Sequence, residues 1–310
     1  MAVISKADAQ ALLARQDINE IVQEAERTSA ALSTFRTIRM SAGVARMPVL
    51  SALPTAGFVS DDTENASSTK PTSNVAWRDK NITAEEIAVI VPIHENVFED
   101  SSFNVWNEVR PLIAQEFGRV LDGAVLFGTN KPTTWDASLE DGARAAGNVY
   151  SAASTGDLAE DINQTWGLVE ADGYDVNINY AARSLRAQLR GLRDANGQPI
   201  YLDNVRADGS TPSIYGEDIH YVTNGAWVPA SGTIPDDTGA TLISGDRSKA
   251  ILGVRQDMTF KILDQATVGG YNLAEKDMIA LRVKFRVGFA VATSVNPEAA
   301  DGYPFAVLSV

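Results

Sequence analysis

The sequence contains no cysteine and only two histidines, His94 and His220, among its 310 residues. The absence of cysteine excludes disulfides, thiolate zinc sites, iron–sulfur clusters and cysteine nucleophiles. Long hydrophobic runs are missing too, since a run such as IAVIVPI at 87–93 is too short to cross a bilayer. The start, MAVISKADAQ, lacks the basic and apolar regions of a signal peptide. We therefore expect a soluble, non-secreted protein that contacts no membrane.

Positive charge is scarce. The 26 Lys and Arg residues are outnumbered by 40 Asp and Glu residues, which gives a formal net charge of −14. This acidity argues against binding nucleic acid over a broad surface, because phosphate contacts need clustered cations. Hydrophobic residues make up 45% of the chain, as in ordinary globular proteins, and the length favours two domains.

Enzyme motifs are also missing. The sequence has no G-x-S-x-G elbow for a serine nucleophile, and it has neither G-x-x-x-x-G-K-[ST] nor G-x-G-x-x-G for a nucleotide. We interpret both histidines as structural. DNVRADG at 203–209 is interpreted as a turn rather than a calcium loop, because it lacks the register and the terminal Glu. Carboxylates occur in four adjacent pairs, most of which we interpret as solvated loop charges: Asp61-Asp62, Glu85-Glu86, Glu99-Asp100 and Asp236-Asp237.

Several segments have the apolar spacing of helices. The strongest is 102–127, in which one apolar face continues from Phe103 to Phe127. Pro111 lies within it and predicts either a kink or a helix that begins near Arg110. The other predicted helices cover residues 5–35, 157–171 and about 179–194.

Extended segments flank a polar stretch in the first third of the chain. The chain is extended over 46–59 and polar and aperiodic over 60–74, apolar character returns at Val75 and Trp77, and a strand that alternates at 87–93 follows. We interpret this order as a long hairpin, and a polar tip of this length is usually either functional or ordered by a partner. Residues 278–291 also alternate strictly, which predicts a strand about twice the usual length. Such elongated elements favour contacts with other subunits.

A row of cations lies in the predicted helix at 179–194. Four arginines recur at steps of three and four residues, beside leucines that would form the core face. The guanidinium fork suits bidentate pairing with carboxylates of a neighbouring acidic subunit, and a solvated helix face is the alternative. The four are Arg183, Arg186, Arg190 and Arg193.

Four segments, in the right order, resemble the major capsid proteins of tailed bacteriophages with the Hong Kong 97 fold. VPIHENVFEDSSFNVWNEVRPLIAQEFGRVLDGAVLFGTN at 91–130 is similar to that family's strand, acidic-serine cap and long spine helix. LRGLRDANGQPIY at 189–201 resembles its helix with an Asp-x-x-Gly turn, and LISGDRSKAILGVRQDMTFKI at 242–262 resembles its Gly-Asp strand and return. MIALRVKFRVGFAVATSVNPEAADGYPFAVL at 278–308 is similar to its long terminal strand. The resemblance covers essentially the whole chain.

The resemblance implies an α+β, Hong Kong 97-like fold and a structural role without catalysis or cofactor. Pentamers and hexamers of this chain would tile an icosahedral shell around double-stranded DNA, which is enclosed without specific binding. Further implied partners are a portal protein, a decoration protein and a scaffolding protein, the last expected to be separate because the arm begins at Met1. The implied location is the virion, after assembly in the bacterial cytoplasm. The implied parts are an N-terminal arm (1–45), an extended loop (46–86), a peripheral domain (87–129 and 249–302) and an axial domain (130–248 and 303–310).

The sequence departs from the family at the residues of a covalent cross-link. Some relatives join a Lys of the extended loop to an Asn of a neighbour, assisted by a Glu. The last two positions read Asp277 and Lys284 here, so we predict no cross-link. Residues 224–239 resemble an insertion and are interpreted as a longer surface loop. Our candidates for contacts between subunits, besides the four arginines, are Lys70, Trp77, Arg78 and Lys80.

Other functions stay open at this point. An encapsulin-type nanocompartment shell has the same fold and would hold protein cargo instead of DNA. From different classes, an acidic metal-assisted hydrolase would need clustered ligands made of oxygen alone. A carbohydrate-binding module would need exposed aromatic residues on a compact monomer.

Overall fold

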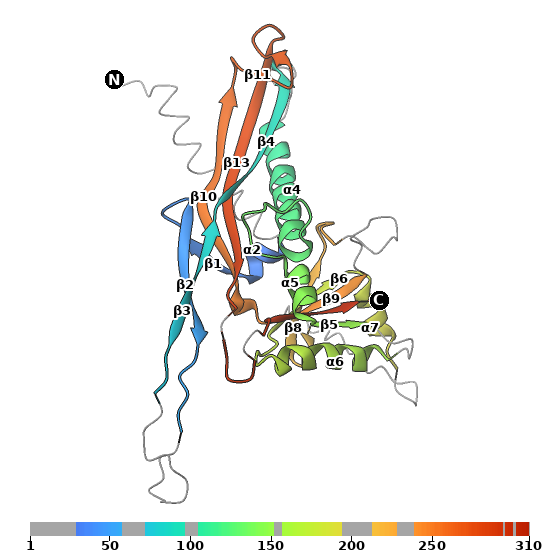
Figure 1. Ribbon diagram of the computed structural model, residues 1–310. Coiled ribbons are helices and arrows are strands. Elements are labelled where there is room, and N and C mark those ends of the chain that lie inside the picture. The colour runs from blue at the N-terminus through green and yellow to red at the C-terminus, as the bar shows by residue number, and fades with distance from the viewer. Residues whose placement is uncertain are drawn as a thin grey trace, which may run out of the picture.

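The computed structural model describes residues 29–57, 72–96, 105–151, 157–193, 213–227, 239–293, 295–299 and 302–309. In Figure 1 the described chain is elongated: a long, narrow sheet stands above a second sheet, and a hairpin projects past one side. Some predictions lie outside the described residues. They are most of the helix at 5–35, most of the polar tip at 60–74, most of the loop at 224–239, the turn at 203–209 and Lys70.

The long sheet contains the predicted long strand. Val283, Phe285 and Val287 of that strand are buried, while Lys284 and Arg286 between them are only half-buried, so the predicted alternation is confirmed. The strand pairs antiparallel with a neighbour on each side. In spatial order the four strands are β1 (Arg36–Arg39), β10 (Ala250–Leu263), β13 (Met278–Val291) and β4 (Glu85–His94).

Helix α4 (Val105–Phe127) covers one face of this sheet (Figure 1). Ile113, Phe117 and Leu121 join the same buried cluster as Phe285 of β13, as the apolar spacing predicted. The helix begins at Val105 and continues through Pro111, so a start near Arg110 is wrong. Because proline has no backbone N–H, the helix lacks one hydrogen bond at Pro111. The packing of the following turns against the sheet offsets the free energy of that missing hydrogen bond.

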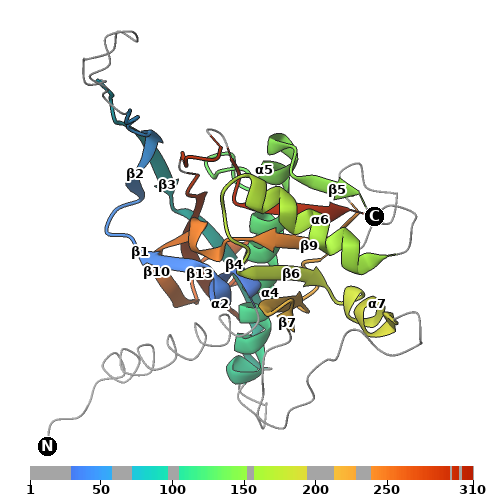
Figure 2. The same ribbon diagram turned by 90° about the horizontal axis from the view of Figure 1, so that it is seen from below.

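The second sheet has six strands and mixes parallel with antiparallel pairs. Its spatial order is β5 (Val149–Ser151), β14 (Phe305–Ser309), β9 (Ala240–Gly245), β6 (Ile178–Ala182), β8 (Glu217–Val222) and β7 (Ser213–Ile214). The helices that follow α4, the spine helix, along the chain are α5 (Leu139–Ala146), α6 (Leu158–Ala171) and α7 (Leu185–Gly191), which Figure 2 shows from below. Helix α6 confirms the prediction at 157–171. Smaller elements are α2 (Ala30–Thr34), the 3-10 turn Arg247–Lys249, β11 (Thr267–Val268) and β12 (Tyr271–Asn272).

The predicted helix at 179–194 is wrong in its first part. Residues Ile178–Ala182 form a strand in the interior of the six-stranded sheet, and all five are buried. The helix itself starts at Leu185 and ends at Gly191. Burial in the sheet, which a local spacing rule does not contain, overrides the helical pattern here.

The predicted hairpin is confirmed in its paired part. Strands β2 (Val44–Ala52) and β3 (Ala76–Thr83) pair antiparallel, with Leu50 opposite Trp77 and Met47 opposite Lys80. One face of the hairpin packs on the long sheet, where Ile82 is buried with Met40 and Ala290. The other face points away from the body.

Two paired glycines let the hairpin cross the long sheet closely. Gly253 of β10 lies opposite Gly288 of β13. A Cβ atom at Gly288 would lie 2.6 Å from the backbone carbonyl oxygen of Thr83, and one at Gly253 would meet the flexible side chain of Met40. Because the contact at Gly288 is with backbone, that position requires glycine and sets where the base of the hairpin rests.

A buried carboxylate ties the start of the described chain to the spine helix. Asp122 of α4 accepts hydrogen bonds from the Ser29 hydroxyl (2.7 Å) and from the backbone N–H groups of Ala30 (2.8 Å) and Ala31 (2.9 Å). Asn224, which follows β8, donates a fourth at 2.6 Å. Burial raises the pKa of the Asp122 carboxyl, and the four donors oppose that rise.

Candidate functional site

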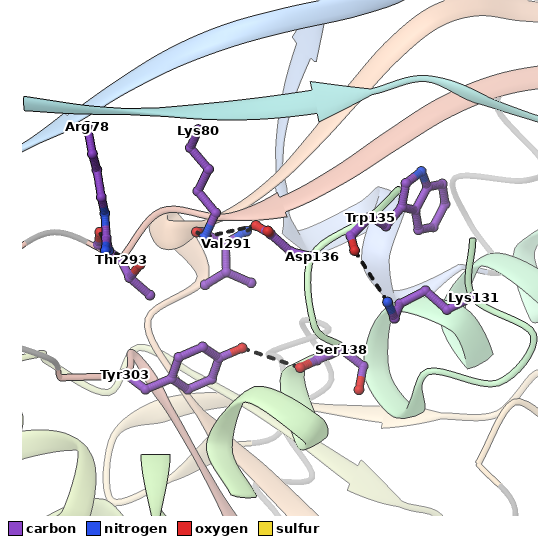
Figure 3. A network of polar contacts seen from close by, with 9 residues as sticks. All are labelled: Arg78, Lys80, Lys131, Trp135, Asp136, Ser138, Val291, Thr293 and Tyr303. Atoms are coloured by element: carbon purple, nitrogen blue, oxygen red, sulfur yellow. Dashed lines mark hydrogen bonds and ion pairs between the residues drawn. The ribbon is translucent and has the colours of Figure 1, made fainter. Parts of the chain in front are cut away.

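The base of the hairpin is held by a lysine that points into the body. Lys80 of β3 lies 2.9 Å from Oδ2 of Asp136 and also donates to the carbonyl oxygen of Val291 at the end of β13. The same Asp136 oxygen accepts from the backbone N–H of Val291 at 3.0 Å. Figure 3 shows these groups together, with the lysine reaching from the hairpin to the body. Both charged side chains are mostly buried, at 21% and 28% exposure, so solvent weakens the pair only in part.

The loop between α4 and α5 makes further contacts with the same region. The indole N–H of Trp135 donates to the carbonyl oxygen of Thr83, the last residue of β3, at 3.1 Å. The hydroxyl of Thr134 donates to Glu85 of β4 at 2.7 Å. On the hairpin itself, Arg78 donates to the backbone and side-chain oxygens of Thr293 at 3.2 and 2.9 Å. The hairpin therefore leaves the body in a defined direction.

Trp77 lies on the opposite face of the hairpin from its neighbours Arg78 and Lys80. Trp77 is 66% exposed, the highest value among the large hydrophobic residues of the described segments. Of the four candidates near the extended loop, the structure thus directs two toward the chain's own body and one toward solvent. Contacts of any of them with another subunit stay a prediction, and Lys70 lies outside the described residues.

A cavity of about 340 Å³ lies between the hairpin and α5, beside the end of β13. Arg78 and Lys80 line one side, and small residues of α5 line another, among them Gly142 and Ala145. Tyr303 is also part of the lining, and its hydroxyl donates to the carbonyl oxygen of Ser138 at 3.4 Å (Figure 3). Burial raises the pKa of the Tyr303 phenol, so this hydroxyl stays a donor at neutral pH.

The four arginines do not form one helical row, so that prediction is wrong. Arg183 precedes α7 in a turn and Arg193 follows its end, which leaves Arg186 and Arg190 on the helix. All four are exposed, while Leu185 is buried on the core face. Arg186 stacks over the ring of Tyr221 with 5.7 Å from Cζ to the ring centroid.

The two positions that depart from the cross-link motif both belong to the long sheet, Asp277 just before β13 and Lys284 in the middle of that strand. Asp277 has a positive φ of 49° just before β13, and its carbonyl oxygen accepts from the N–H of Glu95. Lys284 lies 3.7 Å from Glu86 across the strand pair. Both residues thus have structural contacts within the chain.

The histidines occupy places in strands. His94 ends β4 and is exposed. His220 is half-buried in β8, with its ring 6.4 Å from that of Tyr180, and burial lowers its pKa. Within the described ranges, no three His, Asp or Glu side chains are grouped so that they could hold a metal ion. In the same part of the chain, no helix is both long and apolar enough to span a bilayer.

Sequence reasoning missed the partners of the hairpin base. Asp136 lies in KPTTWDAS, which has no periodicity and no motif. Its contacts with Lys80 and Val291 join segments that are far apart in the chain. No signal in a single sequence marks such a pairing.

Replacing Lys80 by Met is expected to lower the free energy of unfolding by about 1–2 kcal/mol, because mostly buried Asp136 loses its cation and the Val291 carbonyl loses a donor. Urea unfolding of the unassembled protein measures this. Arg46→Met is the matched control, since Arg46 pairs with Asp79 at 3.4 Å in solvent, and its change should stay within about 0.5 kcal/mol. An equal decrease in the free energy of unfolding of the Lys80→Met and Arg46→Met variants would contradict the anchoring role of Lys80.

Comparisons with known proteins agree with this architecture. The model of the phage capsid family matches residues 9–299. The probable major capsid protein gp17 of Mycobacterium phage D29 is 23% identical over 239 residues, covering 71% of this chain and 69% of that protein. The major capsid protein of Staphylococcus phage 80alpha is 24% identical over 231 residues, covering 71% of this chain and 65% of that protein.

Solved structures match over almost the whole chain. A structure from Microbacterium phage Oxtober96 is 55% identical, covers 99% of both chains and has a TM-score of 0.81. One from Mycobacterium phage Bobi is 36% identical, covers 99% of both chains and has a TM-score of 0.79. These matches confirm the resemblance to phage major capsid proteins and the α+β fold that it implied. The chain belongs to the phage capsid family.

Proposed function

We propose that this chain forms the icosahedral shell of a tailed phage by assembling as pentamers and hexamers. The observation that carries the proposal is the long hairpin, which is fixed to the body at its base and projects beyond it (Figure 1). A two-stranded hairpin gains little stability alone, so its paired length is best explained by a surface on another subunit. The role is mechanical and needs no catalytic group.

The proposed division of the chain follows its two sheets. The arm (1–45) and the extended loop (46–86) reach other subunits. The peripheral domain (87–129 and 249–302) contains the spine helix and the long strand. The axial domain (130–248 and 303–310) contains the six-stranded sheet and surrounds the symmetry axis of each pentamer or hexamer. The separate strand orders of the two sheets support the division into peripheral and axial domains, while β1 (Arg36–Arg39) of the arm pairs with β10 in the long sheet of its own chain.

The net charge of −14 supports a shell that encloses double-stranded DNA without binding it specifically. Portal, scaffolding and decoration proteins are the other proposed partners, and the virion, assembled in the host cytoplasm, is the proposed location.

Reversing the charge of two arginine side chains of α7 tests whether these residues contribute to assembly. Arg186→Glu with Arg190→Glu is expected to reduce the yield of pentamers and hexamers, while circular dichroism stays unchanged because both side chains are exposed. Sedimentation velocity measures the yield. The conservative double change to Lys keeps the charge and is the control. Normal assembly of the Glu variant would assign these arginines to a solvated surface.

Sedimentation velocity and negative-stain microscopy of the purified protein test the shell function. Closed shells, or hexamers of about six times 33.2 kDa, are the expected result. Nucleic-acid absorbance in native particles is expected as well, and particles that hold protein cargo without DNA would identify a nanocompartment instead. A chain that stays monomeric when coexpressed with its neighbouring genes would overturn the proposal.

A further inference from the structure

The outer face of the hairpin carries an apolar patch that the chain itself does not cover. In an antiparallel pair, directly opposed residues share a face, so Trp77 shares its face with Leu50, and Asp79 with Pro48. Trp77 is 66% exposed, and Pro48 and Asp79 are exposed as well. A large aromatic side chain left in water on a projecting arm is typical of a residue that anchors an interface.

The cavity beside the hairpin base has the complementary features. Its volume of about 340 Å³ is at the lower end of the range for pockets that receive a ligand-sized group. On the α5 side the ring of Tyr303 covers Gly142, while Ala145 and Ala146 are small and exposed and offer the surface against which a ring could pack. Arg78 stands at its hairpin side, and a guanidinium favours contact with the face of an indole.

From these two surfaces we propose that Trp77 of one subunit inserts into this cavity of a second copy of the chain. This proposal rests on the shell function above and names one contact by which neighbouring subunits join. Asp79 lies on the same face as Trp77 and pairs with Arg46 at 3.4 Å, and the cavity of the second copy is lined by Arg78, Lys80 and Asp136, so charged groups of both signs would meet across the contact.

The geometry favours a second copy over the chain itself. Successive side chains of a strand point to opposite faces, so Trp77 points away from the cavity that its neighbour Arg78 lines. The donor and the receiving surface are therefore different patches of one molecule. Such a contact is heterologous, and repeated around an axis it closes a ring when the rotation allows, as a pentamer or hexamer requires.

Chemical cross-linking tests the contact directly, because the natural chain has no cysteine that could interfere. Asp79→Cys keeps Trp77 in place, and Ala145→Cys marks the cavity. Assembled particles of the double variant are treated with a short bismaleimide and separated under denaturing conditions. We expect bands at two and more times the mass of the chain. Asp79→Cys combined with Ile262→Cys, a residue 51% exposed at the far end of β10, is the control and should give the monomer band alone.

The possible outcomes separate the contact from the shell function. Particles that form but give no cross-link between residues 79 and 145 overturn the contact and leave the shell intact. Equal cross-linking in the control pair also overturns it, because the reaction would then report proximity in general. Absence of particles from the unaltered protein overturns the shell function and the contact with it.

A double-mutant cycle provides an independent measurement. Trp77→Ala is expected to weaken subunit association by about 30-fold, as for an interface anchor. Ala145→Phe fills the cavity and is expected to weaken association similarly. Because both changes remove the same contact, the double variant should be no weaker than either single variant. Multiplying effects in the double variant would show that the two sites act separately and would overturn the contact.

Discussion

Asp122→Ala is expected to lower the free energy of unfolding by about 3–5 kcal/mol, the largest effect of any single substitution considered for this chain. The carboxylate is fully buried and accepts four hydrogen bonds, two on each oxygen. Alanine leaves the N–H groups of Ala30 and Ala31 and the Ser29 hydroxyl buried without an acceptor. Urea unfolding of the unassembled protein, followed by tryptophan fluorescence, measures the loss.

Two further substitutions define what the Asp122 site requires. Asp122→Asn keeps the shape but turns one acceptor oxygen into an NH₂ group that faces donors, so we expect a loss close to that of alanine. Asp257→Ala removes a carboxylate that pairs with Arg39 at 3.1 Å near the surface, and its cost should stay below about 1 kcal/mol. If Asp122→Ala costs no more than Asp257→Ala, the start of the chain is not held by this carboxylate.

Deletion of residues 60–74 is expected to abolish shell formation while the monomer stays folded. Strand pairing in the hairpin ends at Ala52 and Ala76, so the deletion leaves every paired residue in place. Among the described residues of this segment, Ser73 accepts an exposed hydrogen bond from the N–H of Thr55, and the deletion removes it. The free energy of unfolding should therefore change by less than about 0.5 kcal/mol. Sedimentation velocity should show only slowly sedimenting species.

Replacing residues 60–74 by a segment of the same length distinguishes a role of the side chains of the tip from a role of its length. A glycine-serine segment in place of 60–74 restores the length but none of the side chains. Failure of both variants to assemble would assign the contact to the side chains of the tip. Assembly of the replacement alone would assign it to length. Normal shells from the deletion would contradict the proposed role of the hairpin tip.

The long elements of this fold could be predicted because their patterns are local. The alternation at 278–291 and the helical spacing that ends at Phe127 each repeat many times, and the structure contains the predicted elements as β13 and α4. The polar stretch between two extended runs likewise predicted the β2–β3 hairpin. The prediction of a helix at 179–194 was wrong in its first part because Ile178–Ala182 is buried in the six-stranded sheet. The apolar residues of this segment suit a strand as well as a helix.

The sequence by itself determined the acidity of this protein, the classes of chemistry that a chain without cysteine cannot perform, and the regular elements that the peripheral sheet needs. Only the tertiary structure decided which side of the hairpin faces the body, and therefore that Arg78 and Lys80 anchor it while Trp77 stays in solvent. It also decided that Asp122 and Asp136 connect distant segments. Lys80 and Val291 are 211 residues apart. Contacts at such separations form when whole sheets pack together, and no periodicity in a single sequence encodes them.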